Sequence, residues 1–227
     1  MCGRVTQHFN AHDLGQHLQV AGPPINVRPR YNLAPTTSIL AVRTVEGERQ
    51  ASYMRCGLIP AWWKKTAKEV PATFNARAET VTEKPMFRGA WKARRRCIIP
   101  VSGFYEWETR GKAKIPHLFT AADGAPILSI AGMWEAWRDP KGEAITSCTM
   151  IVTSPNAWME RYHDRMVVVL EPEQHEAWLS GEIGEEGLVA AREDLLREHI
   201  VDSRVNRTGV GDDDPTLLQP VPGPLLI

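Results

Sequence analysis

The sequence has few cysteines, no excess of charge and no long apolar run. Its four cysteines form no C-x-x-C pair, which excludes the usual zinc knuckle and disulfide framework. Lysine plus arginine and aspartate plus glutamate each number 27, so any nucleic-acid binding must use a local patch. No segment approaches the roughly 20 apolar residues of a membrane span, and no secretory signal is visible. We therefore expect a cytoplasmic protein in a reducing setting, with no membrane contact, metal or other cofactor.

The composition allows a substantial core, and we expect a single domain over residues 1–227. Hydrophobic residues make up 43% of the chain. The apolar spacing predicts helices over 11–20, 83–92 and 171–180, and a further amphipathic stretch over 185–198 that would cover the sheet. From about residue 211 the chain is rich in aspartate and proline, which predicts a loop-like tail.

Short apolar runs bounded by turn residues predict strands. These runs lie at 38–43, 53–58, 96–100, 117–120, 127–134, 147–153 and 166–170. They do not alternate regularly with helices, which excludes a doubly wound parallel sheet. We predict an α+β fold with a mixed, largely antiparallel, barrel-like sheet and peripheral helices.

Cys2 is the strongest candidate for a reactive residue. If Met1 is removed, Cys2 presents an amine with a pKa of about 7.7–8.0 beside a thiol with a pKa of about 8.5. The amine can condense with an aldehyde to a Schiff base, and the thiol can then close a thiazolidine ring on the same carbon. The thiol can instead attack an amide with its own amine as base. A third interpretation is an initiator methionine followed by an inert small residue.

Three internal segments carry polar groups suited to chemistry. Asn75, Arg77 and Glu79 alternate, so an extended backbone would point them to one face, where the amide can bind a reacting oxygen and the guanidinium a phosphate. Glu106 lies between two aromatic residues, whose desolvation would raise its pKa towards neutrality. His163 stands before a strand and titrates near working pH. Each of these residues also has an ordinary structural interpretation.

Two further segments could contact nucleic acid. Trp62 and Trp63 are adjacent, so in a strand one indole would pack inward while the other stacks on a base. The run Arg94-Arg95-Arg96 is the densest basic segment and is either a solvated helix end or a phosphate-binding patch.

The order of these signals resembles that of the SOS-response-associated peptidase (SRAP) family, over Cys2 to at least Leu170. The motifs that carry the resemblance are Met1-Cys2-Gly3-Arg4, Arg30-Tyr31-Asn32-Leu33-Ala34-Pro35, Trp62-Trp63, Asn75-Ala76-Arg77-Ala78-Glu79-Thr80, Gly103-Phe104-Tyr105-Glu106-Trp107 and His163-Asp164-Arg165-Met166. The resemblance implies a sensor of abasic sites in single-stranded DNA that crosslinks itself to the lesion, and we expect it to act as a monomer, associated with the nucleoid if the organism is bacterial.

The resemblance also implies a role for individual residues. Cys2 would form the thiazolidine with the ring-opened sugar aldehyde, and Asn75 would orient the N-terminal residue. Glu106 would move protons, and His163 would assist ring opening and reversal. Residues implied to contact DNA are Arg4, Pro35, Trp62, Trp63, Arg77, Trp107, Thr153 and Arg165.

Other functions remain open at this point. Class II glutamine amidotransferases also begin with Met-Cys-Gly, but the Asn-Gly element usual in that family is absent from this sequence. An N-terminal-nucleophile amidohydrolase or peptidase, acting at least on its own Met1-Cys2 bond, is a second alternative. A non-covalent single-stranded DNA binding module with a structural Cys2 is the third.

Overall fold

The computed structural model describes residues 3–23, 25–139 and 141–222. Within these ranges the strands are β1 (Val5–Gln7), β2 (Arg30–Leu33), β3 (Ser38–Val45), β4 (Glu48–Cys56), β5 (Asn75–Arg77), β6 (Arg96–Val101), β7 (Gly103–Arg110), β8 (Ala113–Ala121), β9 (Leu128–Arg138), β10 (Ala144–Thr153), β11 (Met166–Val167), β12 (Val169–Leu170) and β13 (Leu196–Ile200). The α-helices are α1 (Ala11–Leu18), α2 (Arg88–Lys92) and α3 (His175–Ser180). Short 3-10 turns are η1 (Ala67–Glu69), η2 (Ala78–Thr80), η3 (Met159–Arg161), η4 (Pro172–Gln174), η5 (Glu185–Gly187), η6 (Glu193–Leu195), η7 (Ser203–Asn206) and η8 (Pro215–Leu218). None of these described helices is long and apolar enough to cross a membrane.

Five strands close into a barrel. β10 pairs with β4, β4 with β3, β3 with β6, β6 with β9, and β9 again with β10. The β4–β10 contact is parallel and the other four are antiparallel. The short strands β5, β11 and β12 add to this sheet. The predicted mixed, largely antiparallel, barrel-like sheet is therefore confirmed.

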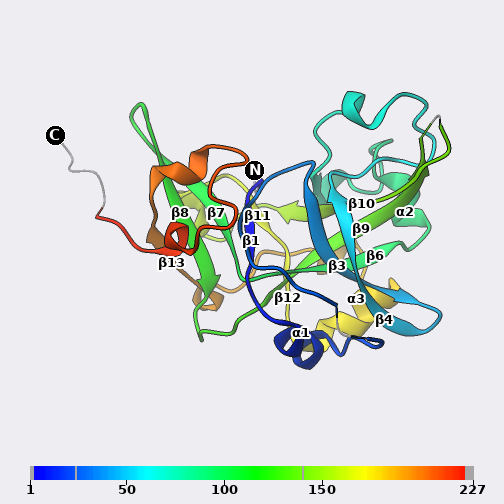
Figure 1. The fold of residues 1–227 in the computed structure, drawn as a ribbon, viewed down its shortest axis with the longest axis horizontal. Helices are drawn as coiled ribbons and strands as arrows, with labels where there is room; N and C mark the ends of the chain where they lie inside the picture. The colour runs from blue at the N-terminus through cyan, green and yellow to red at the C-terminus, as the bar shows by residue number, and fades with distance from the viewer. Residues whose placement is uncertain (1–2, 24, 140, 223–227) are drawn as a thin grey trace.

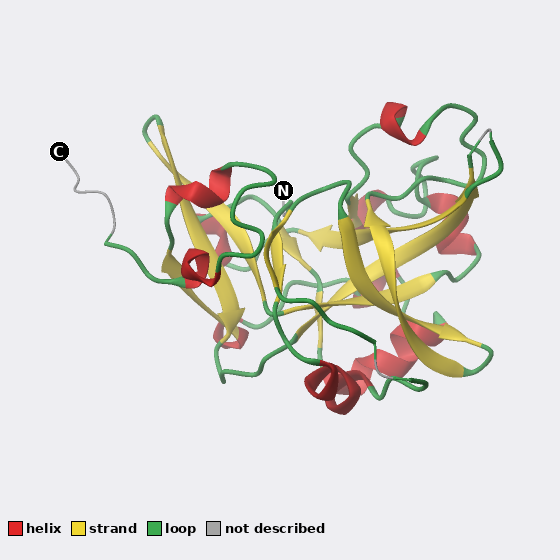
Figure 2. Ribbon diagram, in the orientation of Figure 1, coloured by secondary structure: helices red, strands yellow, loops and turns green. Residues whose placement is uncertain are grey.

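A second sheet lies beside the barrel. Its strand order is β13-β8-β7-β1-β2. In Figure 1, β7, β8 and β13 lie to the left, the barrel strands lie to the right, and the start of the chain passes between them. Figure 2 shows the strands of both halves, with α1 and α3 at the lower edge of the barrel. The site described below forms at the junction of the two sheets.

Side-chain alternation along the barrel strands divides the core in two. Ile39 and Ala41 of β3 belong to a cluster that also contains Phe104 and Phe119 of the second sheet. The intervening Leu40 and Val42 belong to a second cluster, which includes buried residues of α1, α2 and α3. One face of the barrel wall therefore packs towards the second sheet, and the other is covered by helices.

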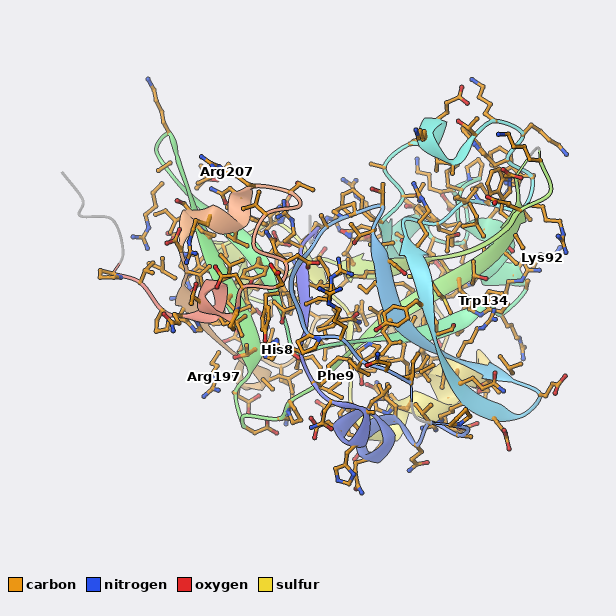
Figure 3. The ribbon with its side chains drawn as sticks, viewed as in Figure 1. His8, Phe9, Lys92, Trp134, Arg197 and Arg207 are labelled. Atoms are coloured by element: carbon orange, nitrogen blue, oxygen red, sulfur yellow. The ribbon has the colours of Figure 1, made fainter. Side chains whose placement is uncertain are left out.

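Gln7 ties β1 to the barrel through three hydrogen bonds. Its Nε2 donates to the carbonyls of Leu40, at 2.9 Å, and Pro100, at 2.6 Å, and its Oε1 accepts from the Leu40 N–H at 2.9 Å. The side chain is 2% exposed, so each of these polar groups would otherwise be buried without a partner. His8 and Phe9 follow β1 where the chain crosses between the two halves (Figure 3).

Most of the element predictions are confirmed, and the helices predicted over 83–92 and 171–180 are observed in part, as α2 and α3. All seven predicted strand runs overlap observed strands, and the 11–20 helix is observed as α1. The predicted amphipathic stretch over 185–198 is wrong as a helix, because it forms two 3-10 turns and then enters β13, which pairs with β8. The described part of the predicted loop-like tail, residues 211–222, contains η8 and is packed, since Leu217 is fully buried and Val221 N–H donates to Ile200 O.

Candidate functional site

The candidate site centres on Glu106 and His163. Glu106 is in β7 and is 1% exposed. His163 is in the segment between β10 and β11, with its Nε2 3.9 Å from Glu106 Oε2. The sequence analysis attributed the desolvation of Glu106 to the two aromatic residues that flank it, and this explanation is wrong. Side chains alternate along β7, so the flanking aromatic residues lie on the opposite face, where the Tyr105 hydroxyl donates to Tyr31 O at 2.8 Å.

Both ring nitrogens of His163 have polar neighbours. The Arg165 N–H lies 3.1 Å from His163 Nδ1, and Nε2 is the atom that faces Glu106. Burial lowers the pKa of His163, and the carboxylate of Asp164, 2.8 Å from Nδ1, acts in the opposite direction. Near neutral pH the ring is therefore mainly neutral and can exchange a proton in either direction.

Asn75 and Arg77 reach the same region through the register of β10. β5 runs parallel to β10, with Asn75 opposite Met150 and Arg77 opposite Val152. On its other side the end of β10 pairs with β11, where Thr153 lies opposite Met166. The end of β10 therefore brings the β5 side chains together with the segment that carries His163. Arg77 is exposed, and Thr153 is buried at this junction.

Arg165 is held at this junction by Glu79. Its Nη1 forms an ion pair with Glu79 Oε1, which also accepts from Ser154 Oγ at 3.4 Å. The prediction that Glu79 shares an extended face with Asn75 and Arg77 is wrong, because the strand ends at Arg77 and Glu79 lies in η2. Glu79 instead neutralises one of the cations expected to bind phosphate.

The two adjacent tryptophans lie in the loop after β4 and contact each other. Their ring centroids are 5.9 Å apart with the planes tilted by 59°, so they do not occupy opposite faces of a strand as predicted. Trp62 is 50% exposed. Trp63 O accepts from Trp137 Nε1 at 2.8 Å, and Trp137 lies opposite Ile145 near the start of β10. This aromatic surface therefore adjoins a different part of β10 from Asn75 and Arg165.

Other residues expected to contact DNA have internal partners. The Arg4 guanidinium is 9% exposed and donates to Asn32 Oδ1, Val205 O and Thr208 Oγ1 at 2.6, 2.7 and 3.1 Å. Trp107 Nε1 donates to Asn206 Oδ1 at 2.6 Å. Both residues therefore anchor the segment around η7, beside the site. Pro35 is half-buried in the turn between β2 and β3.

The run Arg94-Arg95-Arg96 is largely structural. The Arg96 guanidinium lies 3.7 Å from the Trp91 ring and 4.9 Å from the Trp178 ring, and burial lowers its pKa to about 10. Arg95 forms an ion pair with Glu135. The Arg43 guanidinium stacks over the Trp134 ring. Figure 3 shows Trp134 on the barrel half and Arg207 on the half formed by the second sheet. The dense basic run is therefore not an open phosphate patch.

Cys2 lies outside the described residues. Among the residues that are described, no group of three or more histidine, cysteine, aspartate or glutamate side chains is arranged to hold a metal ion. The sequence did not indicate one further polar group beside Glu106, formed by Glu108, His117, Glu198 and Tyr162. Its hydrogen-bonded pair His117 and Glu198 is 81 positions apart, and no local pattern connects the members.

The family described as SOS response associated peptidase (SRAP) matches residues 1–208. The chain belongs to the SRAP family.

Several named relatives are similar over most of this chain. Abasic site processing protein YoqW of Bacillus subtilis (strain 168) is 38% identical over 183 residues, which are 79% of this chain and 80% of that protein. Abasic site processing protein YedK of Escherichia coli (strain K12) is 29% identical over 191 residues, 81% of each chain. HMCES of Xenopus tropicalis, also named an abasic site processing protein, is 29% identical over 65% of this chain and 52% of its own length.

Solved structures have the same fold. A crystal structure of a Bordetella bronchiseptica protein has a TM-score of 0.79 and 28% identity, and it covers 88% of this chain and 100% of that chain. A crystal structure of a Bacteroides thetaiotaomicron protein has a TM-score of 0.86 at 23% identity, over 97% of this chain and 100% of that chain. The barrel and the second sheet are thus shared at low sequence identity.

Proposed function

We propose that this protein senses abasic sites in single-stranded DNA and couples to them covalently through Cys2 once Met1 is removed. The observation that carries the proposal is the facing pair His163 and Glu106, at the end of β10 beside Asn75. The names of the relatives, abasic site processing proteins, support the choice of lesion. A crosslink of this kind would shield the lesion from other reactions.

The register of β1 supports Cys2 as the nucleophile. Val5 lies opposite Phe104, and the Tyr105 N–H donates to Arg4 O at 2.9 Å. The same antiparallel register would bring Gly3 beside Glu106. Consecutive Cα atoms are about 3.8 Å apart, so the Cα of a residue bonded to Gly3 must lie within that distance of the Gly3 Cα.

The proposed reaction needs one acid and one base. An abasic sugar is mostly a closed hemiacetal, so His163 would assist proton transfer at the ring oxygen to release the aldehyde. The Cys2 amine then adds to the aldehyde carbon, and Glu106 would move the protons needed to expel water and form the imine. Addition of the Cys2 thiol to the same carbon closes the thiazolidine. In total one C–N and one C–S bond form and one water leaves, with no oxidant or reductant.

The proposed DNA path uses the exposed groups around this site. Arg77 and Arg165 would hold phosphates, and Trp62, half exposed, would stack on a base that flanks the lesion. Stacking requires unpaired bases, so we propose a preference for single strands over duplex.

All residues in the proposal come from one chain, so a monomer suffices, and we propose that it acts in the cytoplasm.

A second activity is suggested by the family name. A thiol nucleophile near Glu106 and His163 could also cleave a peptide, and we propose self-removal of Met1 as the simplest such reaction because it would expose the Cys2 amine. The state of Met1 in protein made in cells, wild type or Cys2→Ala, does not test this, because cellular aminopeptidases can also remove Met1. Release of Met1 from a purified, Met1-retaining sample is the decisive readout.

The main experiment is denaturing electrophoresis after mixing the mature protein with abasic single-stranded DNA. We expect a heat-stable adduct whose intact mass is that of protein plus DNA minus one water. Cys2→Ala should abolish it, and Cys2→Ser should leave at most a labile imine, because a hydroxyl closes the ring less readily than a thiol. Undamaged DNA of the same sequence is the control.

A stable adduct with Cys2→Ala equal to wild type would overturn the proposal. Binding of abasic and intact strands with no covalent product would instead favour the non-covalent single-stranded DNA module.

A further inference from the structure

A polar network around the buried His117 lies on the same side of the second sheet as Glu106. His117, on β8, is 2% exposed and lies between two carboxylates. Its Nδ1 is 2.7 Å from Glu198 Oε2 on β13, and its Nε2 is 3.2 Å from Glu108 Oε2 on β7. The Tyr162 hydroxyl donates to the other oxygen of Glu198 at 2.8 Å. Three neighbouring strands are thus hydrogen-bonded to the segment that follows β10.

The network adjoins both members of the proposed acid/base pair. His117 lies directly opposite Glu106 in the β7–β8 register. Tyr162 immediately precedes His163, and the N–H groups of both residues donate to Met159 O, at 2.9 and 3.1 Å. A shift of the Tyr162 hydroxyl would therefore move His163 relative to β7.

The Tyr162 ring is also fixed by aromatic packing. Its centroid lies 4.8 Å from that of His117, 5.2 Å from that of Phe119 and 5.5 Å from that of Trp158, each in an edge-on arrangement. Burial, together with the hydrogen bond to Glu198, raises the pKa of Tyr162 to about 12. The hydroxyl is therefore a permanent donor at working pH, and its hydrogen bond to Glu198 adds to the packing that fixes the ring.

We propose that Tyr162, anchored through Glu198 to His117, is a positioning residue that sets the separation between His163 and Glu106. The proposal rests on the proposed function of that pair. Tyr162 touches neither DNA nor the reacting atoms in this scheme; it acts by holding the segment that carries His163. A misplacement of about 1 Å at a reacting group can slow a reaction by roughly 100-fold.

The test compares two tyrosine-to-phenylalanine substitutions. Tyr162→Phe removes the hydroxyl and retains the packed ring. Tyr53→Phe is the matched control, because the Tyr53 hydroxyl on β4 also donates one hydrogen bond, to Asn26 O at 3.1 Å. We expect Tyr162→Phe to bind intact single-stranded DNA within about twofold of wild type and to crosslink abasic DNA about 10- to 100-fold more slowly. Tyr53→Phe should match wild type in both measurements.

A double variant separates positioning from a general structural effect. If Tyr162 acts through His163, Tyr162→Phe should cause no further slowing in a His163→Ala background, whereas independent effects would multiply. Glu198→Gln, which keeps an oxygen acceptor for Tyr162, should crosslink faster than Glu198→Ala.

The outcomes distinguish this inference from the proposed function. The positioning role would be overturned if the Tyr162→Phe protein crosslinks at the wild-type rate. It would also be overturned if Tyr162→Phe slows crosslinking by the same factor in the His163→Ala background as in the wild-type background. A wild-type protein that forms no adduct would overturn the proposed function itself.

Discussion

The Nε2 atom of His163 faces the buried Glu106 carboxylate at 3.9 Å, although the two residues are far apart in the sequence. Glu106 is in β7 of the second sheet, and His163 lies between two strands of the barrel sheet, β10 and β11. The separation is larger than a hydrogen bond, so the two groups face each other without a direct hydrogen bond. An acid and a base that face one space can act on two atoms of one bound sugar.

The first prediction concerns the different tasks of these two residues. Glu106→Gln should slow crosslinking by up to about 10²–10⁴-fold, because expulsion of water from the carbinolamine needs a proton acceptor. His163→Ala should slow ring opening and, by microscopic reversibility, release of the adduct. Single-turnover crosslinking, followed by exchange against excess abasic DNA, measures both directions. Affinity for intact single strands should change little in either variant, and wild-type rates in both directions for His163→Ala would return that residue to a structural role.

The second prediction concerns Glu79, whose carboxylate pairs with Arg165. Glu79→Gln should tighten binding of intact single-stranded DNA at low salt, because it frees a cation and removes a charge that repels phosphate. Log affinity should also fall more steeply with log salt, by up to about 0.7 if one more phosphate is neutralised. Fluorescence anisotropy over a salt series measures this, with Glu46→Gln in the exposed β3–β4 turn as the control. Equal affinities for Glu79→Gln and wild type would contradict the competition between Glu79 and phosphate.

The third prediction concerns thiol reactivity. Cys56, Cys97 and Cys148 are all buried, and burial raises the pKa of each thiol, to about 12 for Cys56. Iodoacetamide should therefore modify the native protein once, at Cys2, and the unfolded protein at all four cysteines. Intact mass spectrometry counts the adducts, and Cys2→Ser should remain unmodified when native. Rapid modification of two or more sites in the native protein would show that the barrel core is open to solvent.

The fourth prediction concerns stability against acid. His175 is 2% exposed, and its pKa is lowered to about 4, first by burial and then by the charges of His17 and Arg49. The unfolded side chain has a pKa of about 6.5, so between these values the unfolded state binds more protons. The stabilisation is complete above about pH 6.5 and is lost as the pH falls towards 4, with a magnitude on the order of 3 kcal/mol.

Urea unfolding at pH 7 and pH 4.5 checks this dependence. His175→Gln should lose less stability over that interval than wild type, whereas His12→Gln, on the exposed side of α1, should lose as much. An unchanged pH dependence in His175→Gln would place the acid sensitivity elsewhere.

The sequence predicted those elements whose apolar spacing is set locally. The structure contains α1, β3, β6 and β10, whose apolar patterns can be recognised from the local sequence alone. β5 and β7 were not predicted as strands. The partner of β5 is the remote β10, whereas β7 pairs with the adjacent β8 but has no continuous apolar run. The segment 185–198 has helical spacing, yet pairing with the edge of β8 dominates local propensity.

Residue chemistry was more informative for the site than local pattern. Glu106 and His163 were selected because a carboxyl group and an imidazole suit proton transfer, and the structure brings them together. The resemblance implied that Arg4 contacts DNA, and in the structure its guanidinium donates to groups inside the protein. The network of His117 and Glu198 was not anticipated, since it depends on the register of three strands.

The fixation of β1 has a consequence for the speed of any reaction at the start of the chain. Arg4 and Gln7 each make three hydrogen bonds to other segments, so the backbone is immobilised from the second residue after Cys2. A nucleophile on a free chain end would lose much of its orientational freedom in the transition state. The residues from Arg4 onward give up that freedom during folding, before any lesion is encountered, and well-oriented reacting groups reach effective concentrations of about 10⁵–10⁸ M.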